Sequence, residues 1–381
     1  MKRAILAIVV GGLALAALAH AGPTYKGMSY CAWNEDSTDP NWETDLTQSF
    51  DNMAALGVNS LALNVFWFQD NLSSTAIAPD TGWWTTQEAS LTKVVTEAKS
   101  RGMSVMIKPM VDVKTGEWRG DIASSNAWFD NAGGYKDFVN HWANWATANG
   151  VDSLSVGCEL KGTEANGTKW RETIAGVQSR FSGTVTYAAN WDDVYDTSRW
   201  GVIDWWDTLD YIGLDAYFPL TGDGVWQNGT TDPTETELMA KWAARAGLIE
   251  DWLAWLPEED RKKILFAEIG YQSIDGVNRR PNWAPGPDDG APPWTPDPLE
   301  QAMCYSAALG ETWDRTWMDG YYWWIWETDP NAGGPTDTYF TPQNKPAEDV
   351  LRAYYTIPEP ATLALLAVGV AALLRRRRAR R

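Results

Sequence analysis

The chain has 381 residues and a formal net charge of −19 at pH 7, and it contains 25 Trp but only two His. His20 lies in a segment that we expect to be cleaved off, and His141 lies in a helical pattern. A nucleophilic triad with a His base and a His-rich metal site are therefore both hard to build, and paired carboxylates are the main option left for acid–base chemistry. The acidic surplus also disfavours nucleic acids and anionic lipids as partners, whereas neutral substrates fit it well.

The first 21 residues have the pattern of a secretory signal peptide. Lys2 and Arg3 form the charged start, an apolar run follows from 4 to 18, and Ala19-His20-Ala21 supplies the small residues of a cleavage site. An uncleaved membrane anchor is the alternative, but the well-formed cleavage site favours removal. We therefore expect the mature domain to begin at residue 22 and to work outside the cytoplasm.

Strand-like runs alternate with helical patterns eight times between residues 22 and 356, without a low-complexity linker. The first helical pattern has Pro40 near its start, Trp42, Leu46 and Phe50 at helical spacing, and Gly57 at its end. Eight β-then-α units over this length predict one α/β domain, a (β/α)8 TIM barrel spanning 22–356. The expected strands are 27–33, 58–67, 103–111, 151–159, 184–190, 209–217, 264–270 and 320–326, and the later helices are 87–101, 132–149, 168–181, a weak one near 193–206, 234–256, 298–317 and 346–355.

Successive side chains of a strand point to opposite faces, and in each expected strand one set is bulky and apolar while the other is smaller or polar. We expect the bulky set to meet the helices and the other set to face the barrel axis. Polar side chains then gather at the C-terminal ends of the strands, where the active sites of such barrels form. The inward set includes Asn64; Met106 and Lys108; Ser155, Gly157 and Glu159; Thr186, Ala188 and Asn190; Gly213, Asp215 and Tyr217; Phe266, Glu268 and Gly270; and Tyr322, Trp324 and Trp326.

The cysteines Cys31, Cys158 and Cys304 have no spacing that suggests a metal site, and we interpret them as buried free thiols. Alternation directs Cys31 inward and Cys158 outward, which argues against a disulfide between them. A run of aspartates between 204 and 215 suggests a cation site, but surface charge with one inward member, Asp215, explains it better. We expect no metal and no cofactor.

Glu159 and Glu268 stand at the ends of the fourth and seventh expected strands, in SVGCEL and ILFAEIGY. Glycoside hydrolysis needs two carboxylates across a sugar ring: one protonates the leaving oxygen, and the other attacks or activates water. A single Glu at a strand end is more often a structural ion pair, but two at matched positions, with Asn190, Tyr217 and Trp326 beside them, favour catalysis. The residues alone decide neither their separation nor which one is the acid.

A family resemblance is carried by four segments, GVQSRFSGTVTYAANWDDV, WWDTLDYIGLDAYFPL, ILFAEIGYQSIDG and DGYYWWIW. Over about 25–355 the chain resembles glycoside hydrolase family 113, a (β/α)8 family of retaining β-mannanases. The resemblance implies an endo-β-1,4-mannanase with Glu159 as general acid/base and Glu268 as nucleophile. It also implies that Tyr217 hydrogen-bonds Glu268, that Trp326 forms the floor under the sugar at the cleavage point, and that Asn190 contacts sugar hydroxyls.

The same resemblance makes Trp33, Asn64 and Lys108 further candidates for substrate binding. Cys158 is a departure, because many relatives in the wider clan carry Asn before the acid/base. That Asn contacts the sugar 2-hydroxyl, so the contact is missing here or is supplied elsewhere, and Asn190 is the substitute that we consider.

Tryptophans at expected strand ends and in loops suit stacking on the faces of sugars, although any single Trp is about as often a core residue. The Pro- and Gly-rich loop 278–298 follows the seventh strand and should rim the site, either as a substrate-gripping loop or as an elaborate surface loop. The tryptophans at expected strand ends and in loops are Trp33, Trp67, Trp83, Trp84, Trp191, Trp226, Trp283, Trp294 and Trp326.

The C-terminal segment 357–381 combines Pro358-Glu359-Pro360, an apolar run from 361 to 374 and a cluster of arginines. At about 1.5 Å per residue the run spans about 21 Å, short of a hydrocarbon core of about 30 Å. The three-part pattern resembles a PEP-CTERM sorting signal, which implies exosortase-type processing machinery and export to the surface or exterior of a Gram-negative bacterium. A plain C-terminal anchor is the alternative. Without both terminal segments the chain keeps 23 basic and 49 acidic residues, a net charge of −26.

These observations predict a glycosidase that acts on a neutral β-linked polysaccharide, with mannan or glucomannan as the first guess. A cell-surface barrel that binds polysaccharide without cleaving it is an alternative from another class. A related β-glycosidase or transglycosidase that uses the same two glutamates is the third option. We expect no nucleic-acid partner, and membrane contact only through the terminal segments.

Overall fold

The computed structural model describes residues 22–33, 40–82, 84–123, 125–222, 232–282 and 294–357. The expected signal peptide lies outside the described residues, as do residues 358–381 of the expected sorting segment. Trp83, Trp226, Trp283 and the centre of the loop 278–298 also lie outside them. Within the described ranges, no helix combines the length and the apolar character that crossing a membrane requires.

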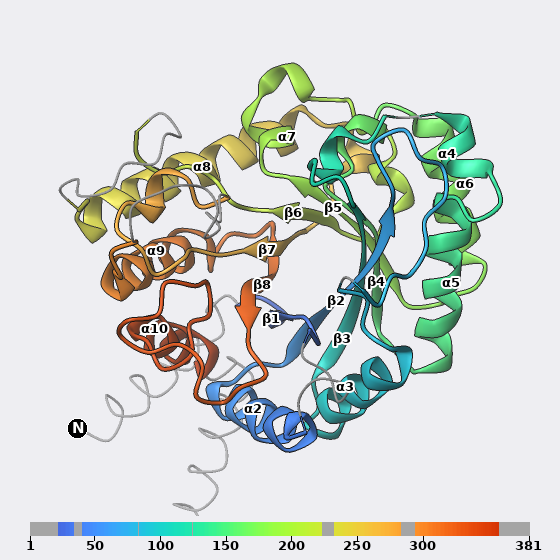
Figure 1. The fold of residues 1–381 in the computed structure, drawn as a ribbon. Coiled ribbons are helices and arrows are strands. Elements are labelled where there is room, and N and C mark those ends of the chain that lie inside the picture. Colours follow the sequence, from blue (N-terminus) through green and yellow to red (C-terminus); the bar gives the residue numbers. More distant parts are fainter. Residues whose placement is uncertain are drawn as a thin grey trace, which may run out of the picture.

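Eight parallel strands close into a barrel in their order along the chain, and β1 pairs with both β2 and β8 (Figure 1). Parallel neighbours need a crossover connection, and helices outside the barrel supply most of these crossovers. The predicted (β/α)8 architecture is therefore confirmed. The strands are β1 (Tyr25–Tyr30), β2 (Ser60–Gln69), β3 (Ser104–Val113), β4 (Ser153–Cys158), β5 (Thr184–Asn190), β6 (Ile212–Asp215), β7 (Ile264–Ile269) and β8 (Met318–Trp326).

Most of the expected helices form, and α2 shows why. Trp42, Leu46 and Phe50 lie on its buried face, and Gly57 ends it with a φ of +92°, a conformation that glycine adopts without a Cβ penalty. The weak pattern near 193–206 forms no long helix, because Asp196 is extended and its side chain instead accepts from Ser198 N in a new turn. The helices are α2 (Trp42–Leu56), α3 (Glu88–Ser100), α4 (Asn126–Asp130), α5 (Tyr135–Ala148), α6 (Gly167–Gln178), α7 (Asp192–Tyr195), α8 (Glu235–Trp255), α9 (Pro298–Thr312) and α10 (Pro346–Tyr355).

The layer between the barrel and the helices is rich in buried aromatic rings. Trp170 of α6 stacks on Trp205 with ring centroids 4.8 Å apart, and its indole N–H donates to the Thr163 carbonyl at 3.1 Å. Tyr187 of β5 packs edge-on against both indoles and donates to Glu164 at 2.7 Å. These tryptophans are core residues, and the polar atom of each ring has a partner, as burial requires.

The strand alternation is as expected along β2, β3, β5 and β6, but it fails within β4, β7 and β8. The register shifts between Ser155 and Cys158 of β4, and irregularities also occur where β7 pairs with β6 and β8 and where β8 pairs with β1. An extra residue in one strand moves every later side chain to the other face.

The expected faces of Gly157, Cys158 and Phe266 are wrong for this reason. Cys158 points into the barrel and Gly157 points outward, since a Cβ on Gly157 would lie 2.8 Å from the Tyr135 hydroxyl in the outer layer. Phe266 also faces the helices and packs against Trp242. The expectation of three buried free thiols is confirmed.

We expect Trp170→Ala to lower the free energy of unfolding by about 3–5 kcal/mol, because the substitution leaves a cavity under α6 and removes the donor to Thr163. Denaturant unfolding measures the loss. Trp255→Ala is the matched control, since Trp255 is 51% exposed and its truncation should cost about 0.5 kcal/mol or less. Equal losses in the two variants would contradict the assignment of Trp170 to the core.

Candidate active site

A cleft of about 1190 Å³ opens at the C-terminal end of the barrel, where strand ends and the following loops meet. Its polar floor contains both glutamates, Glu159 and Glu268, and aromatic side chains form much of its wall. The lining residues are Trp33, Phe66, Trp84, Met110, Asp112, Trp118, Arg119, Glu159, Asn190, Trp191, Asp192, Tyr217, Glu268, Arg280, Asn282, Trp324, Tyr339 and Phe340.

Glu159 directly follows β4 and has a φ of +52°, in the left-handed region that few residues other than glycine adopt. Its carboxylate accepts from Asn190 Nδ2 at 2.8 Å through Oε1 and from Trp118 Nε1 at 3.2 Å through Oε2. This backbone conformation, after the bulge of β4, still delivers the side chain to the cleft. Strained backbone of this kind occurs often at functional sites.

Burial raises the pKa of Glu159 above its usual value, and the nearby charge of Glu268 raises it further. Arg119 opposes both effects, as does the hydrogen bond from Trp118. The balance favours a protonated Glu159 at higher pH than an exposed glutamate allows. A carboxyl group in this state can act as a general acid.

Glu268 belongs to β7 and is held from both sides. Oε1 accepts from the ammonium of Lys108 at 2.6 Å, and Oε2 accepts from the hydroxyl of Tyr217 at 2.8 Å. An ammonium ion and a donating phenol both stabilise a negative charge on this carboxylate. The two glutamates of the cleft therefore have different surroundings: burial favours the proton on Glu159, whereas a cation and a phenol bond Glu268.

The Lys108 ammonium also bonds Asp215 of β6, at 2.9 Å to Oδ1 and 3.2 Å to Oδ2. Burial, and then the charge of Glu268, raise the pKa of Asp215 to about 8 in spite of Lys108. The Cys158 thiol donates to Asp215 Oδ2 at 3.3 Å and accepts from Arg119 Nη1 at 3.2 Å. A continuous polar network thus runs beneath the cleft from Glu268 of β7 to Arg119 in the loop after β3.

The described residues contain two groups of carboxylate or thiol side chains close enough together to share a metal ion. In the first group, Cys158, Asp215 and Glu268, the Lys108 ammonium already supplies a positive charge between the two carboxyl groups. In the second group Glu300 accepts from backbone N–H groups near Asn278, outside the cleft.

The expected site residues fall into three sets. Trp33, Asn190 and Tyr217 line the cleft with the two glutamates. Lys108 and Asn64 lie beneath it, fully buried, and the Asn64 amide donates weakly to the carbonyls of Tyr30 and Ala62 at 3.3 and 3.4 Å. These two residues support the site from below instead of touching a ligand in the cleft.

Trp326, expected as the floor of the sugar site, is not in the cleft. It is 1% exposed, packs in the outer core and donates its indole N–H to Ser49 at 2.7 Å. Trp324 lines the cleft in its place. The alternation of β8 breaks between the two, because Trp324 and Ile325 both pack against the inner cluster, and a sequence pattern does not record this break.

Several cleft residues carry no signal in the sequence. Trp118 and Arg119 come from the loop after β3, and Tyr339 and Phe340 come from the segment between β8 and α10. Loops lack a periodic pattern, so neither helix nor strand spacing indicates which of their side chains turn toward the barrel axis. The nearest available signal was the abundance of Trp at strand ends.

A (β/α)8 barrel in which glutamates from β4 and β7 face one aromatic-lined cleft has the arrangement of a glycoside hydrolase. The family model for Glycoside Hydrolase Family 113 matches residues 31–345, and the chain belongs to this family. The model for the PEP-CTERM protein-sorting motif matches residues 356–378. Both predicted resemblances are thereby confirmed. No curated protein has significant similarity to the chain.

Solved structures agree with the family assignment. The GH113 β-mannanase from Alicyclobacillus acidocaldarius is 25% identical, with a TM-score of 0.69 over 88% of this chain and 97% of that one. A second GH113 β-1,4-mannanase is 25% identical, with a TM-score of 0.70 over 88% of this chain and all of that one. A family 5 mannosidase from Rhizomucor miehei, 13% identical with a TM-score of 0.54 over 88% of this chain and 93% of that one, shares the fold alone.

We expect the stability of the protein to fall as pH rises from about 4 to about 8, in part through Asp215. The folded state keeps a proton on Asp215 up to about pH 8, whereas an unfolded aspartate loses it near 3.8, so the folded state binds more protons in this window. Asp215→Asn should therefore flatten the dependence, by up to about 1.4 kcal/mol per pH unit. Denaturant unfolding at pH 5, 6, 7 and 8 measures it.

Asp314→Asn, on the exposed surface, is the control and should keep the slope of the wild type. The lower overall stability of Asp215→Asn, which removes a partner of Lys108, does not affect the comparison, because the slope is the readout. An Asp215→Asn variant with the slope of the wild type would show that Asp215 is ionised throughout.

Proposed function

We propose that this protein is a retaining glycoside hydrolase that cleaves a neutral β-linked polysaccharide, and that it is an endo-β-1,4-mannanase. The observation that carries the proposal is the contrast between two glutamates in one cleft. Burial raises the pKa of Glu159, while Lys108 and Tyr217 both bond Glu268. A general acid and a nucleophile need different surroundings, one that keeps a proton on the acid and one that stabilises the attacking carboxylate.

In the first step of the proposed mechanism, a carboxylate oxygen of Glu268 attacks the anomeric carbon and the glycosidic bond breaks. The electrons of that bond go to the leaving oxygen, which takes the proton of Glu159. The product is a glycosyl ester on Glu268 and an ionised Glu159. Attack displaces the leaving group from the opposite face, so the configuration at carbon inverts once.

In the second step Glu159 acts as base. It removes a proton from a water molecule, whose oxygen attacks the anomeric carbon and displaces the Glu268 carboxylate. A second inversion restores the original configuration, and both glutamates return to their starting states. Asn190, which donates to Glu159 Oε1, fixes the orientation of the acid and lies where it can reach substrate hydroxyls.

Mannan is proposed as the substrate because the family members with 25% identity described above are a β-mannanase and a β-1,4-mannanase. The aromatic walls of the cleft suit the apolar faces of sugars, and the acidic chain disfavours anionic glycans. The sorting motif at 356–378 supports export and exosortase-type processing, which would bring the enzyme to polysaccharide outside the cytoplasm.

We expect Glu268→Gln to lower kcat/KM on mannan by at least about 10³-fold, because the amide can form no glycosyl ester. Glu159→Gln should lower it by about 10²–10⁴-fold, the contribution of a general acid. Reducing-sugar release from mannan, glucomannan, xylan and cellulose measures both. Glu258→Gln, on the exposed turn before β7, is the matched control and should keep full activity.

The outcomes separate the alternatives. A wild type that binds these polysaccharides but cleaves none would favour the non-catalytic barrel. Disaccharide acceptors extended faster than substrate is hydrolysed would favour a transglycosidase. Full activity in Glu268→Gln, or an inverted anomer as the first product in proton NMR spectra, would contradict the mechanism.

Trp324 and Trp326 should respond differently to truncation. Trp324→Ala removes an aromatic surface of the cleft and should lower kcat/KM about tenfold with little change in stability. Trp326→Ala removes a core ring and should lower the free energy of unfolding by about 3–5 kcal/mol. Steady-state kinetics and denaturant unfolding on both variants test the assignment, and the reverse pattern would restore Trp326 as the floor.

A further inference from the structure

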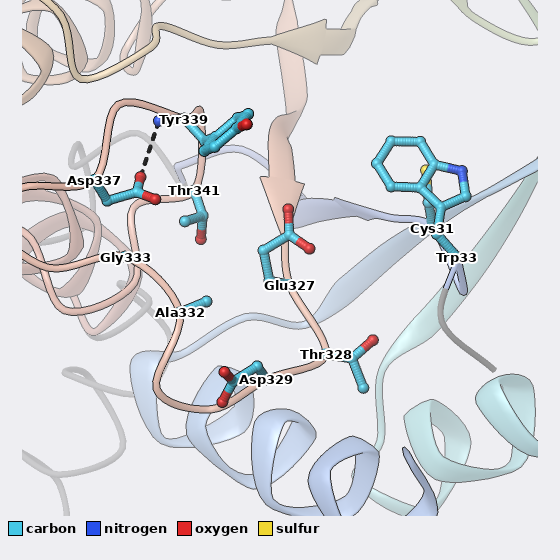
Figure 2. A pocket seen from close by; sticks show the side chains of 10 residues that line it. All are labelled: Cys31, Trp33, Glu327, Thr328, Asp329, Ala332, Gly333, Asp337, Tyr339 and Thr341. Carbon is cyan, nitrogen blue, oxygen red and sulfur yellow. Dashed lines mark hydrogen bonds between the residues drawn. The ribbon is translucent and has the colours of Figure 1, made fainter. Parts of the chain in front are cut away.

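The cleft has an open side and a packed side. Beside the C-terminal ends of β1 and β8, a hollow of about 330 Å³ leaves space around Glu327 (Figure 2). Across the barrel, β4 and β5 rest on the layer of aromatic rings under α6, and that layer also contains buried charged residues. Glu159 directly follows β4 and Asn190 ends β5, so the geometry of the proposed acid depends on the packed side.

The hydroxyl of Tyr187 connects this layer to the backbone next to Glu159. It accepts from the Leu160 N–H at 2.9 Å and donates to Glu164 Oε1 at 2.7 Å. The ring of Tyr187 is fully buried and packs edge-on against two indoles, so its oxygen has a fixed position. The bond therefore holds the peptide group that joins Glu159 to Leu160.

The backbone at Glu159 needs such support. Its φ of +52° is unfavourable for a residue with a Cβ, and such a conformation persists only where the surrounding structure enforces it. The N–H of Glu159 donates to the Ala188 carbonyl at 2.8 Å, and the next N–H donates to Tyr187. Two neighbouring residues of β5 thus fix the peptide groups on both sides of the proposed acid.

Glu164 is itself held in place below this turn. It is fully buried, Arg199 bonds its second oxygen, and the same guanidinium bonds Asp193 Oδ1 at 2.5 Å. Burial, and then the charge of Asp193, raise the pKa of Glu164, whereas Tyr187 and Arg199 oppose this rise. A carboxyl group keeps an acceptor oxygen in either protonation state, so the bond from Tyr187 does not depend on the charge.

The same contacts tie the loop after β4 to the segment after β5. Arg199 and Asp193 belong to that segment, and Lys161 adds an ion pair with Asp192 at the start of α7. The Asp192 N–H donates to Asn190 Oδ1 at 3.2 Å, which leaves Asn190 Nδ2 to donate to Glu159. The acid and its amide partner are therefore positioned by one connected set of bonds.

We propose that Tyr187 and Glu164 are positioning residues for the reaction. Acting through the Leu160 amide, they hold the turn at Glu159 so that its carboxyl group reaches both the glycosidic oxygen and the attacking water. Both residues are fully buried in the layer under α6, behind the strands that carry the cleft. The inference rests on the proposed function, because it takes Glu159 as the acid and base.

Tyr187→Phe removes one oxygen atom and keeps the ring. It should lower kcat/KM on mannan by about 10–10²-fold, because a displacement of the acid by about 1 Å is enough for such a loss. On 2,4-dinitrophenyl β-mannobioside, kcat/KM should change by less than about twofold, since the leaving phenolate needs no proton from Glu159. Steady-state kinetics on both substrates measure this difference.

A double-mutant cycle on mannan tests whether Tyr187 acts through the acid. In the background of Glu159→Ala, which has no acid to position, Tyr187→Phe should lower kcat/KM by less than about twofold. A role in stability alone would give the same loss in both backgrounds.

Tyr135→Phe is the matched control. Tyr135 is also a fully buried tyrosine of this layer, and its hydroxyl donates to the Val156 carbonyl of β4 at 2.5 Å, away from the turn at Glu159. Both variants lose one buried hydroxyl, so their melting temperatures should fall by similar amounts. Tyr135→Phe should nevertheless keep the kinetic constants of the wild type on both substrates.

The outcomes separate the positioning role from the proposed function. Equal losses in Tyr187→Phe on the two substrates, or no loss on mannan, would overturn the positioning role while the wild type still defines a hydrolase. A Tyr187→Phe variant that is unfolded under assay conditions that leave Tyr135→Phe folded would show a structural role alone. If the wild type cleaves only mannan, the cycle decides. If it cleaves neither compound, the proposed function fails and the positioning role fails with it.

Discussion

The ammonium of Lys108 is the interaction on which the rest of the site depends. It is fully buried, and it joins β3 to Asp215 of β6 and Glu268 of β7, so one cation sets the spacing of three strand ends. Above the pKa of Asp215, Lys108 separates two carboxylates in a medium that solvates charge poorly, where each unpaired ion would cost several kcal/mol. Burial disfavours the charge of Lys108 itself, but the carboxylates outweigh this effect and raise its pKa.

The tryptophans of this chain have two structural uses. Trp170, Trp205 and Trp206 fill the space between barrel and helices, where large rings give dense packing, and the N–H groups of Trp170 and Trp205 donate to backbone carbonyls. Trp33 and Trp118 remain more than a third exposed at the mouth of the barrel. The abundance that first suggested sugar binding therefore reflects the core at least as much as the cleft. Only their position relative to the strand ends separates the two uses.

The barrel could be predicted from the sequence because its signals are local and repeated. Leu61, Leu63 and Val65 alternate with smaller or polar neighbours along β2, and a regular strand carries that alternation from end to end. The alternation breaks near the C-terminal ends of β4 and β8, and the predicted faces of Cys158 and Trp326 are therefore wrong. A bulge leaves no recognisable pattern in the sequence, yet it shifts the alternation of the residues that follow it.

In the candidate site, too, some features could be predicted from the sequence and others could not. Alternation directed Lys108 and Asp215 inward, but their ion pair joins residues 107 positions apart, and no spacing rule relates them. The loop residues Trp118 and Tyr339 were invisible for a different reason, because irregular backbone has no period to follow. Features that depend on one strand were predictable, and features that depend on the meeting of several elements were not.

Arg119 gives the cleft a second fixed cation. Its guanidinium bonds Asp112 and the Cys158 thiol, and its charge opposes the rise in the pKa of Glu159. In the proposed cycle the negative charge leaves Glu268 when the ester forms and appears on Glu159 when the proton departs. The charge thus passes from the neighbourhood of Lys108 to that of Arg119, and the total charge of the site stays constant. The reaction therefore shifts one negative charge between two carboxyl groups, and each group already lies near a cation.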